Sequence, residues 1–220
     1  MKPSAIAVGL LAILLATGCV KPVASKDYSK FRSEDPSSIL VVPVINRSVD
    51  VTASDYFLST LAVPLAERGY YVFPTYMVKR MLEDDGLSDA NLVHSADARK
   101  LGSLFGADAV LYVTINKWDA KYAVLSTSVE VDFNYVLKSC KTGEELWKSH
   151  QARVYVPQSR STGNPIADLI TMAINAAATK AAPNYMPMAR QSNQLAFYPP
   201  HQGLPDGPHG EAHGKDKDQF

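Results

Sequence analysis

Residues 128–138, SVEVDFNYVLK, alternate apolar and polar side chains, and this alternation decides the fold class. A period of two predicts a β-strand, extending over residues 124–138, with one buried face and one face exposed to solvent. The following Lys141-Thr142-Gly143-Glu144 predicts a hairpin turn, after which residues 145–156 return as the partner strand. The buried face would carry Val129, Val131, Phe133, Tyr135 and Leu137, and the exposed face Ser128, Glu130, Asp132, Asn134 and Val136.

The chain before this hairpin alternates strands with helices. Residues 38–45, SILVVPVI, are apolar on both faces and predict a central strand, with Pro43 at a bulge or an edge. The order β-α-β-α-α-β-β-β-α predicts a single α/β (α+β) domain over residues 38–190, a mixed sheet of about five strands with helices packed on it. Further strands are expected at 70–73 and 109–118, and helices at 52–69, 74–85, 95–106 and 164–182.

Composition excludes several classes of protein. The chain has 220 residues, 46% of them hydrophobic, so it can bury a core and is not a largely disordered protein. Lys and Arg together number 22 and Asp and Glu also 22, so the net charge of zero gives no electrostatic reason to expect nucleic acid as a partner. No run reaches the roughly 20 apolar residues of a membrane-spanning helix, which excludes a polytopic membrane protein.

The amino terminus has the pattern of a bacterial export signal. Lys2 precedes the apolar run 5–15, AIAVGLLAILL, and small residues then lead to Cys19. This pattern resembles the lipobox of bacterial lipoproteins, which implies a signal peptide over residues 1–18 and S-diacylglycerol and N-palmitoyl groups on Cys19. An ordinary secretory signal with an incidental cysteine is the alternative. Val20, in place of the Asp that retains lipoproteins at the inner membrane, favours the outer membrane as a rule of sorting.

Two segments outside the predicted domain differ from it in composition. Residues 19–37 are polar and are expected to form a lipidated tether. Residues 191–220 are rich in Pro and His and show no periodicity, so we expect a disordered tail. Within it His209 and His213 are four residues apart, but the glycines and proline around them disfavour a helix, and no metal site is predicted.

The sequence contains no recognisable catalytic or nucleotide-binding motif, and we predict no enzymatic activity and no cofactor. Cys140 is left without a disulfide partner if Cys19 is lipidated, and we interpret it as a structural thiol. Two alternatives stay open. A peptidoglycan-related hydrolase would need Asp108, Glu130 or His150 to converge in one pocket. A small-ligand-binding module would need an apolar cavity lined by Tyr71 and Tyr112.

Aromatic residues gather in two places and have two interpretations. They can be core residues, or they can form a surface for a protein partner, since Tyr and Trp are favoured at interfaces. The residues considered for such a surface are Tyr70, Tyr71, Tyr76, Trp118 and Tyr122.

Three motifs in a fixed order resemble a known family. They are GYYVFP at 69–74, GADAVLY at 106–112 after Leu101–Phe105, and KTGEELW at 141–147. Together they resemble the genome-derived neisserial-type lipoprotein family over about residues 38–190. More loosely they are similar to a group that includes the curli-secretion lipoprotein, the penicillin-binding-protein activator lipoprotein and the amino-terminal domain of the Tol translocation protein.

This resemblance implies a small mixed α/β domain without known catalysis. We therefore expect an outer-membrane lipoprotein, facing the periplasm, that acts as an accessory or protein-binding component of envelope assembly, secretion or transport. The expected partners are the membrane, through the lipid anchor, and other envelope proteins or further copies of the same chain. No nucleic acid is expected.

Overall fold

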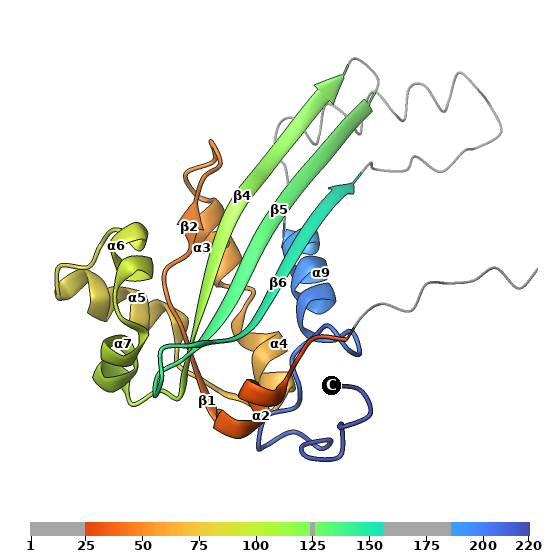
Figure 1. Ribbon diagram of the computed structural model, residues 1–220. Coiled ribbons are helices and arrows are strands. Elements are labelled where there is room, and N and C mark those ends of the chain that lie inside the picture. The colour runs from red at the N-terminus through yellow and green to blue at the C-terminus, as the bar shows by residue number, and fades with distance from the viewer. Residues whose placement is uncertain (1–24, 124–125, 156–185) are drawn as a thin grey trace, which may run out of the picture.

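A computed structural model describes residues 25–123, 126–155 and 186–220 of the chain (Figure 1). Its centre is one mixed sheet with the strand order β3-β1-β4-β5-β6, in which β2 also pairs with β4. Pairing of β1 with β3 and β4 is parallel, whereas β4, β5 and β6 pair antiparallel. The predicted fold class, α/β (α+β) with a mixed sheet, is confirmed. The strands are β1 (Ser38–Val41), β2 (Ile45–Asn46), β3 (Tyr71–Val72), β4 (Ala109–Ala123), β5 (Ser126–Ser139) and β6 (Glu145–Tyr155).

The alternation in residues 128–138 is realised as the buried face of β5. Val131, Phe133, Tyr135 and Leu137 are all buried in the larger of two hydrophobic clusters. Gly143, at the predicted hairpin turn, has φ of 79°, a left-handed conformation that favours glycine. The alternating pattern therefore predicted both the strand and the side that it buries.

Pro43 interrupts the central strand as a bulge. Val41 pairs with Leu111 and Ile45 with Thr114, so four steps along the first segment match three steps along β4. The extra residue separates β1 from β2, which is the effect of a β-bulge. Proline fits here because it has no backbone N–H to leave without a partner.

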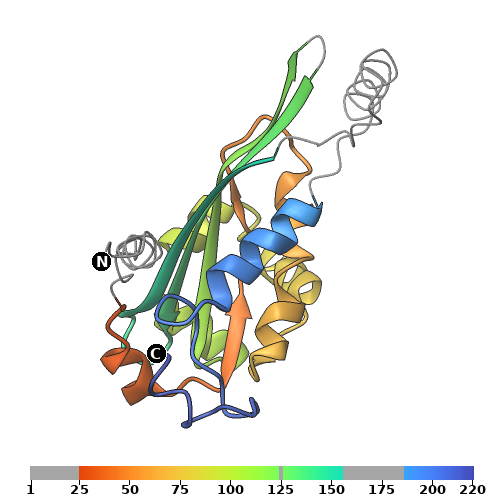
Figure 2. The ribbon, with the colours of Figure 1, turned by 90° about the vertical axis from the view of Figure 1, so that its right-hand side faces the viewer.

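Helices cover both faces of the sheet (Figure 2). The larger cluster lies against α3 (Ala53–Leu58), α4 (Ala62–Glu67) and α9 (Met186–Phe197). The smaller one lies on the opposite face, against α5 (Thr75–Asp84), α6 (Ala90–Ser95) and α7 (Ala98–Phe105). The helix expected from Asn164-Pro165 lies outside the described residues. Within the described ranges, no helix is long and apolar enough to cross a membrane.

Helix boundaries depart from the prediction in two places. The helix expected at 52–69 is two helices, and Pro64 lies in the first turn of α4, where a missing N–H costs nothing. The helix expected from Ser95 to Gly106 is α7, but it begins after Asp97, whose side chain accepts a hydrogen bond from Arg99 N, and Ser95 instead ends a further helix, α6, that was not predicted and that Asp89 begins by accepting from Asn91 N.

The expectation that residues 19–37 form a tether is wrong for residues 25–37. They contain a short helix, α2 (Ser29–Glu34), and Tyr28 and Phe31 are buried in the larger cluster. The Tyr28 hydroxyl donates to the carbonyl of Gly203 at 2.7 Å, which joins this segment to the far end of the chain. Most of this segment is polar, so its composition gave no sign that two of its side chains are aromatic anchors. Burial of these two rings stabilises the attachment of the segment to the domain.

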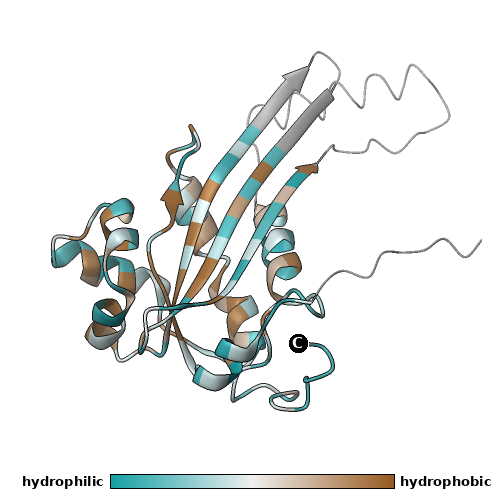
Figure 3. Ribbon diagram, viewed as in Figure 1, coloured by the Kyte–Doolittle hydropathy of each residue, from teal (hydrophilic) through white to brown (hydrophobic). Residues whose placement is uncertain are grey.

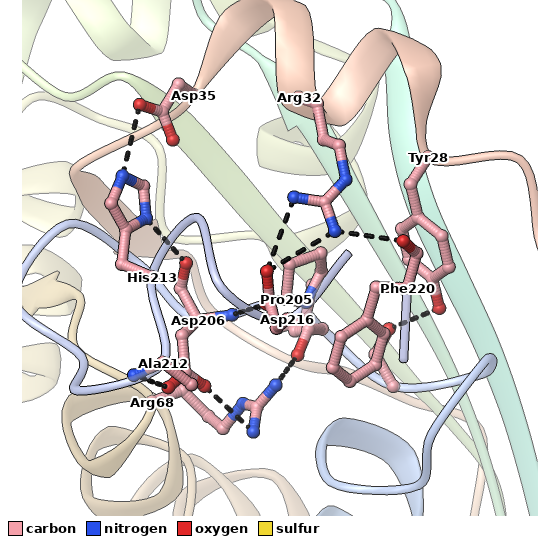
Figure 4. A network of polar contacts seen from close by, with 12 residues as sticks. Tyr28, Arg32, Asp35, Arg68, Pro205, Asp206, Ala212, His213, Asp216 and Phe220 are labelled. Atoms are coloured by element: carbon pink, nitrogen blue, oxygen red, sulfur yellow. Dashed lines mark hydrogen bonds and ion pairs between the residues drawn. The ribbon is translucent and has the colours of Figure 1, made fainter. Parts of the chain in front are cut away.

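The expectation of a disordered tail over residues 191–220 is also wrong. Helix α9 buries Ala196 and Phe197, and Leu204 is fully buried beyond it. The last 23 residues, 198–220, form what we call the C-terminal strap. Ion pairs of Arg32 with Asp216 (3.3 Å) and Arg68 with Asp206 (2.9 Å) hold it to α2 and to the end of α4 (Figure 4).

The strap is ordered by contacts that no local pattern contains. Arg32 also donates to a main-chain oxygen of Phe220 at 2.9 Å, and the Phe220 ring packs edge-on against Tyr28. Proline and glycine remove regular secondary structure, but they do not prevent a segment from packing when charged and aromatic side chains anchor it. His213 is one such anchor, since its ring faces Asp35 at 3.6 Å and the Asp206 carbonyl at 3.0 Å.

Candidate protein-contact surface

The five aromatic residues considered for partner contact fall into different environments. Tyr70 is 4% exposed and Trp118 1%, so the prediction that they contact a partner is wrong. The Tyr70 hydroxyl donates to the Pro205 carbonyl under the strap, and the Trp118 ring packs edge-on against Phe57. The side chain of Tyr122 lies outside the described part.

Tyr71 and Tyr76 remain exposed, at 55% and 56%, and they belong to a larger group of exposed apolar side chains. The members of this group come from β3 and from the helical layer α5–α7, on one side of the sheet, where Figure 3 shows apolar segments among polar ones. We call it the helical-layer surface. It consists of Tyr71, Tyr76, Met77, Met81, Leu92 and Leu104.

Helix α5 presents this surface because it is apolar on two adjacent stripes. Val78 and Leu82 are buried against the sheet, and Met77 and Met81, each one position earlier, are 64% and 46% exposed. Residues four apart lie on the same side of a helix, so the two methionines form a stripe beside the buried one. Methionine adapts its shape to a partner, and it is enriched where proteins bind one another.

Aromatic contacts link β3 to α7 through Phe73, which lies between β3 and α5. The rings of Tyr71 and Phe73 meet edge-on at 5.0 Å, and Phe73 meets Phe105 of α7 at 6.4 Å. Phe73 is partly buried against the smaller cluster, which fixes the position of the exposed Tyr71 ring. A rigid aromatic side chain of this kind loses little conformational entropy when a partner covers it.

Charged side chains lie among the apolar ones on α5. The Lys79 ammonium lies 2.5 Å from Asp55, and Arg80 lies 3.2 Å from Asp84 and 3.7 Å from Glu83. Because Arg80 follows Tyr76 by four positions, charged and apolar side chains share this side of the helix. Protein interfaces combine both kinds of contact.

The structure does not bring together the residues that a hydrolase would need. Asp108 precedes β4, whereas Glu130 pairs with Asp119, eleven residues farther along that strand. At the rise of an extended strand this separates Asp108 from Glu130 by about 36 Å. His150 lies 3.0 Å from Asp132 on β5.

Cys140 has the character of a structural thiol. Burial, with a smaller effect of the negative charge of Asp108, raises its pKa to about 12. A thiol of this kind holds its proton at neutral pH and is a poor nucleophile.

The cavity that a small-ligand module would need is not formed between Tyr71 and Tyr112. Tyr71 is on the edge strand β3, Tyr112 is on β4, and β1 lies between these strands. Tyr112 is buried, and its ring meets His94 of α6 edge-on at 5.0 Å. Burial lowers the pKa of His94, and the hydrogen bond to the Pro43 carbonyl opposes this with a smaller effect. The imidazole is therefore neutral at pH 7 and contributes to packing.

Sequence reasoning missed four of the six residues of the helical-layer surface. Met77 and Met81 stand one position before Val78 and Leu82, and this pair of adjacent apolar stripes was the available signal. Leu92 and Leu104 gave no such signal, because a single leucine on a short helix is equally compatible with burial.

The comparisons with known proteins agree with this architecture. The family model "Putative lipoprotein GNA1162-like" matches residues 26–209. "Putative lipoprotein NMB1124/NMB1162" of Neisseria meningitidis serogroup B is 33% identical over 211 residues, which cover 94% of this chain and 96% of that protein.

Solved structures also match parts of this chain. The crystal structure of lipoprotein GNA1162 from Neisseria meningitidis is 33% identical, with a TM-score of 0.54, and the match covers 68% of this chain and all of that one. The PelC dodecamer from Paraburkholderia phytofirmans is more distant, at 17% identity and a TM-score of 0.40 over 63% of this chain and 84% of that one. The resemblance drawn from the three motifs is confirmed: this chain belongs to the GNA1162-like lipoprotein family.

Proposed function

We propose that this protein is an outer-membrane lipoprotein, anchored through Cys19, whose domain faces the periplasm and binds other envelope proteins without catalysing a reaction. Its role would be accessory, in envelope assembly, secretion or transport. The observation that carries the protein-binding part is the helical-layer surface, an exposed group of Tyr, Met and Leu side chains on α5–α7 and β3.

The anchor is supported by the sequence and by the family. Small residues lead from the apolar run at 5–15 to Cys19, the acceptor position of a lipobox. Membership of a family described as lipoproteins supports the same chemistry. Several acyl chains on one residue hold a protein stably at a bilayer, since each buried CH₂ contributes about 0.8 kcal/mol.

The chain provides a matched test of the anchor, because it has two cysteines. Cys19→Ala should abolish incorporation of labelled palmitate in the native host and shift the protein out of the outer-membrane fraction. Cys140→Ala should leave both unchanged. Palmitate incorporation that survives in Cys19→Ala would show that the anchor lies elsewhere.

A second matched pair tests the contact surface. Tyr76 on α5 and Tyr56 on α3 are 56% and 53% exposed, and they lie on helices that cover opposite faces of the sheet. A photo-crosslinking amino acid at position 76 should capture an envelope protein, identifiable by mass spectrometry, in intact cells. The same amino acid at position 56 should not capture that protein. Equal capture at both positions, or none at position 76, would contradict the assignment.

A further inference from the structure

A groove of about 690 Å³ runs beside the edge strand β6, on a different part of the molecule from the helical-layer surface. Its lining includes Lys26, Lys148, His150 and Arg153, together with Leu195 of α9. Within the described chain the side chains that line it include no Asp or Glu. The groove is therefore cationic and partly apolar.

Two of its cations, Lys26 and Arg153, have no carboxylate partner among the residues that the structure describes. The Lys26 ammonium donates to the carbonyls of Lys148 (2.6 Å) and Gln202 (2.5 Å), and it stands 4.9 Å from the centre of the Trp147 ring. Arg153 contacts the Gln151 amide oxygen and the neighbouring main chain. Within the described ranges, neither of these positive charges is paired with a carboxylate.

The other two groups are partly compensated from outside the groove. Lys148 lies 2.8 Å from Glu145, and its side chain is 69% exposed. His150 lies 3.0 Å from Asp132 on β5. The local field nevertheless favours an anion, because Lys26 and Arg153 carry the uncompensated charge.

The chain enters the domain beside this groove. Lys26 lines the groove and its backbone N–H donates to the His201 carbonyl at 3.0 Å, so the described chain begins at the groove. Only seven steps of chain separate Lys26 from Cys19. Fully extended, they reach at most about 25 Å. A tether running to residue 37 would have reached about 60 Å, so the burial of Tyr28 and Phe31 removes more than half of the domain's freedom to move away.

Among the described strands, β6 pairs only with β5, so its outer edge forms the edge of the described sheet beside the groove. Because Lys148 directs its carbonyl outward to Lys26, the alternation of an antiparallel ladder also directs the backbone groups of His150, Ala152 and Val154 away from β5. These amide groups are additional hydrogen-bond donors for an anion that enters the groove.

We infer that the groove between Lys26, Arg153 and the edge of β6 binds the phosphate headgroup of an anionic membrane lipid and sets the orientation of the domain on the bilayer. The inference rests on the proposed lipid anchor at Cys19. Two features favour this ligand. The groove is positively charged, and the short segment between Cys19 and Lys26 would keep it close to a bilayer whose surface carries phosphates. Each Lys or Arg near an anionic bilayer strengthens attachment about fivefold.

The test uses the complete mature lipoprotein reconstituted in vesicles of phosphatidylcholine, with or without phosphatidylglycerol. Hydrogen exchange of the peptide covering residues 145–155 should slow in the anionic vesicles and not in the zwitterionic ones. Added salt should reverse the protection, and inorganic phosphate at matched ionic strength should not compete beyond that effect. Arg153→Glu should reduce the protection by at least about fivefold. Arg47→Glu, the same charge change at an exposed position after β2, should not.

The outcomes separate the inference from the anchor. Protein that floats with both kinds of vesicle but shows equal exchange in them would overturn the headgroup site and leave the anchor intact. Protection that rises with protein density in both lipids would assign the β6 edge to a second copy of the chain and overturn the headgroup site too. Protein that floats with neither kind of vesicle would contradict the anchor itself.

Discussion

Asp108 and Ser38 form reciprocal hydrogen bonds where the parallel strands β1 and β4 begin. The Ser38 hydroxyl and backbone N–H donate to Asp108 Oδ2 at 2.8 and 2.9 Å, and Asp108 N donates back to the Ser38 hydroxyl at 3.0 Å. Ser37 adds two further donors to the same oxygen. The aspartate of the family-like GADAVLY motif thus joins two strands that lie 70 residues apart.

Replacing Asp108 should destabilise the protein by about 2 kcal/mol at neutral pH, since hydrogen bonds to a charged group contribute about that much. Asp108→Ala should show this in urea unfolding. Asp85→Ala, an exposed aspartate at the end of α5, should not. An unchanged midpoint in Asp108→Ala would contradict the role of the carboxylate.

The same carboxylate predicts a pH dependence. Burial alone would raise the pKa of Asp108, but the hydrogen bonds from Ser37 and Ser38 outweigh it and hold the pKa below its ordinary value. A lowered pKa in the folded state means that the contribution is present at neutral pH and is lost as the pH falls through that pKa. The stability difference between wild type and Asp108→Ala should therefore shrink below about pH 4.

The C-terminal strap should contribute measurably to stability. Asp216 is 3% exposed, and besides Arg32 it accepts a hydrogen bond from Asp206 N at 2.9 Å. Removing one partner of a buried ion pair costs about 3 kcal/mol, so Asp216→Ala should lower the melting temperature by on the order of 10 °C. Asp218→Ala, on the exposed side of the strap, is the control. Equal melting temperatures for the two variants would mean that the strap does not pack as described.

Cys140 should resist alkylation in the folded protein. Its pKa of about 12 leaves a thiolate fraction at neutral pH on the order of a thousandfold below that of an ordinary cysteine. Iodoacetamide labelling followed by mass spectrometry should show slow modification in buffer and rapid modification in urea. Rapid labelling in buffer would show that the thiol is accessible and ionised.

Lys26 should make stability rise with pH in the alkaline range. Burial, with a smaller effect of the neighbouring Lys148, lowers the pKa of Lys26 to about 8 from an ordinary value of 10.5. Between these values the unfolded chain binds more protons than the folded one, so the contribution of Lys26 to stability increases from about pH 8 to 10.5. Lys26→Met should remove this increase, measured as the difference in unfolding free energy from wild type across that range. A constant difference would show that the ammonium is not desolvated.

The sequence by itself determined the long antiparallel strands, the hairpin turn that joins two of them, and the bulge in the central strand. The alternation at 128–138 and the turn at 141–144 are local, because side chains of a strand point to opposite faces whatever lies above them. Pro43 likewise signalled the bulge through its missing N–H. The family motifs, including the one that contains Asp108, could be recognised because each is a short, continuous stretch of sequence.

The tertiary structure alone decided which aromatic side chains face solvent and which segments outside the sheet are packed. Tyr70 and Trp118 are buried because the strap and α3 lie over them, and Tyr71 is exposed because β3 is an edge strand. Arg32 and Asp216 are separated by 184 residues. Contacts between residues so far apart produce no periodicity in the sequence. Polar, proline-rich segments therefore resemble disordered ones, and only the tertiary structure shows that a few of their side chains are buried against the core.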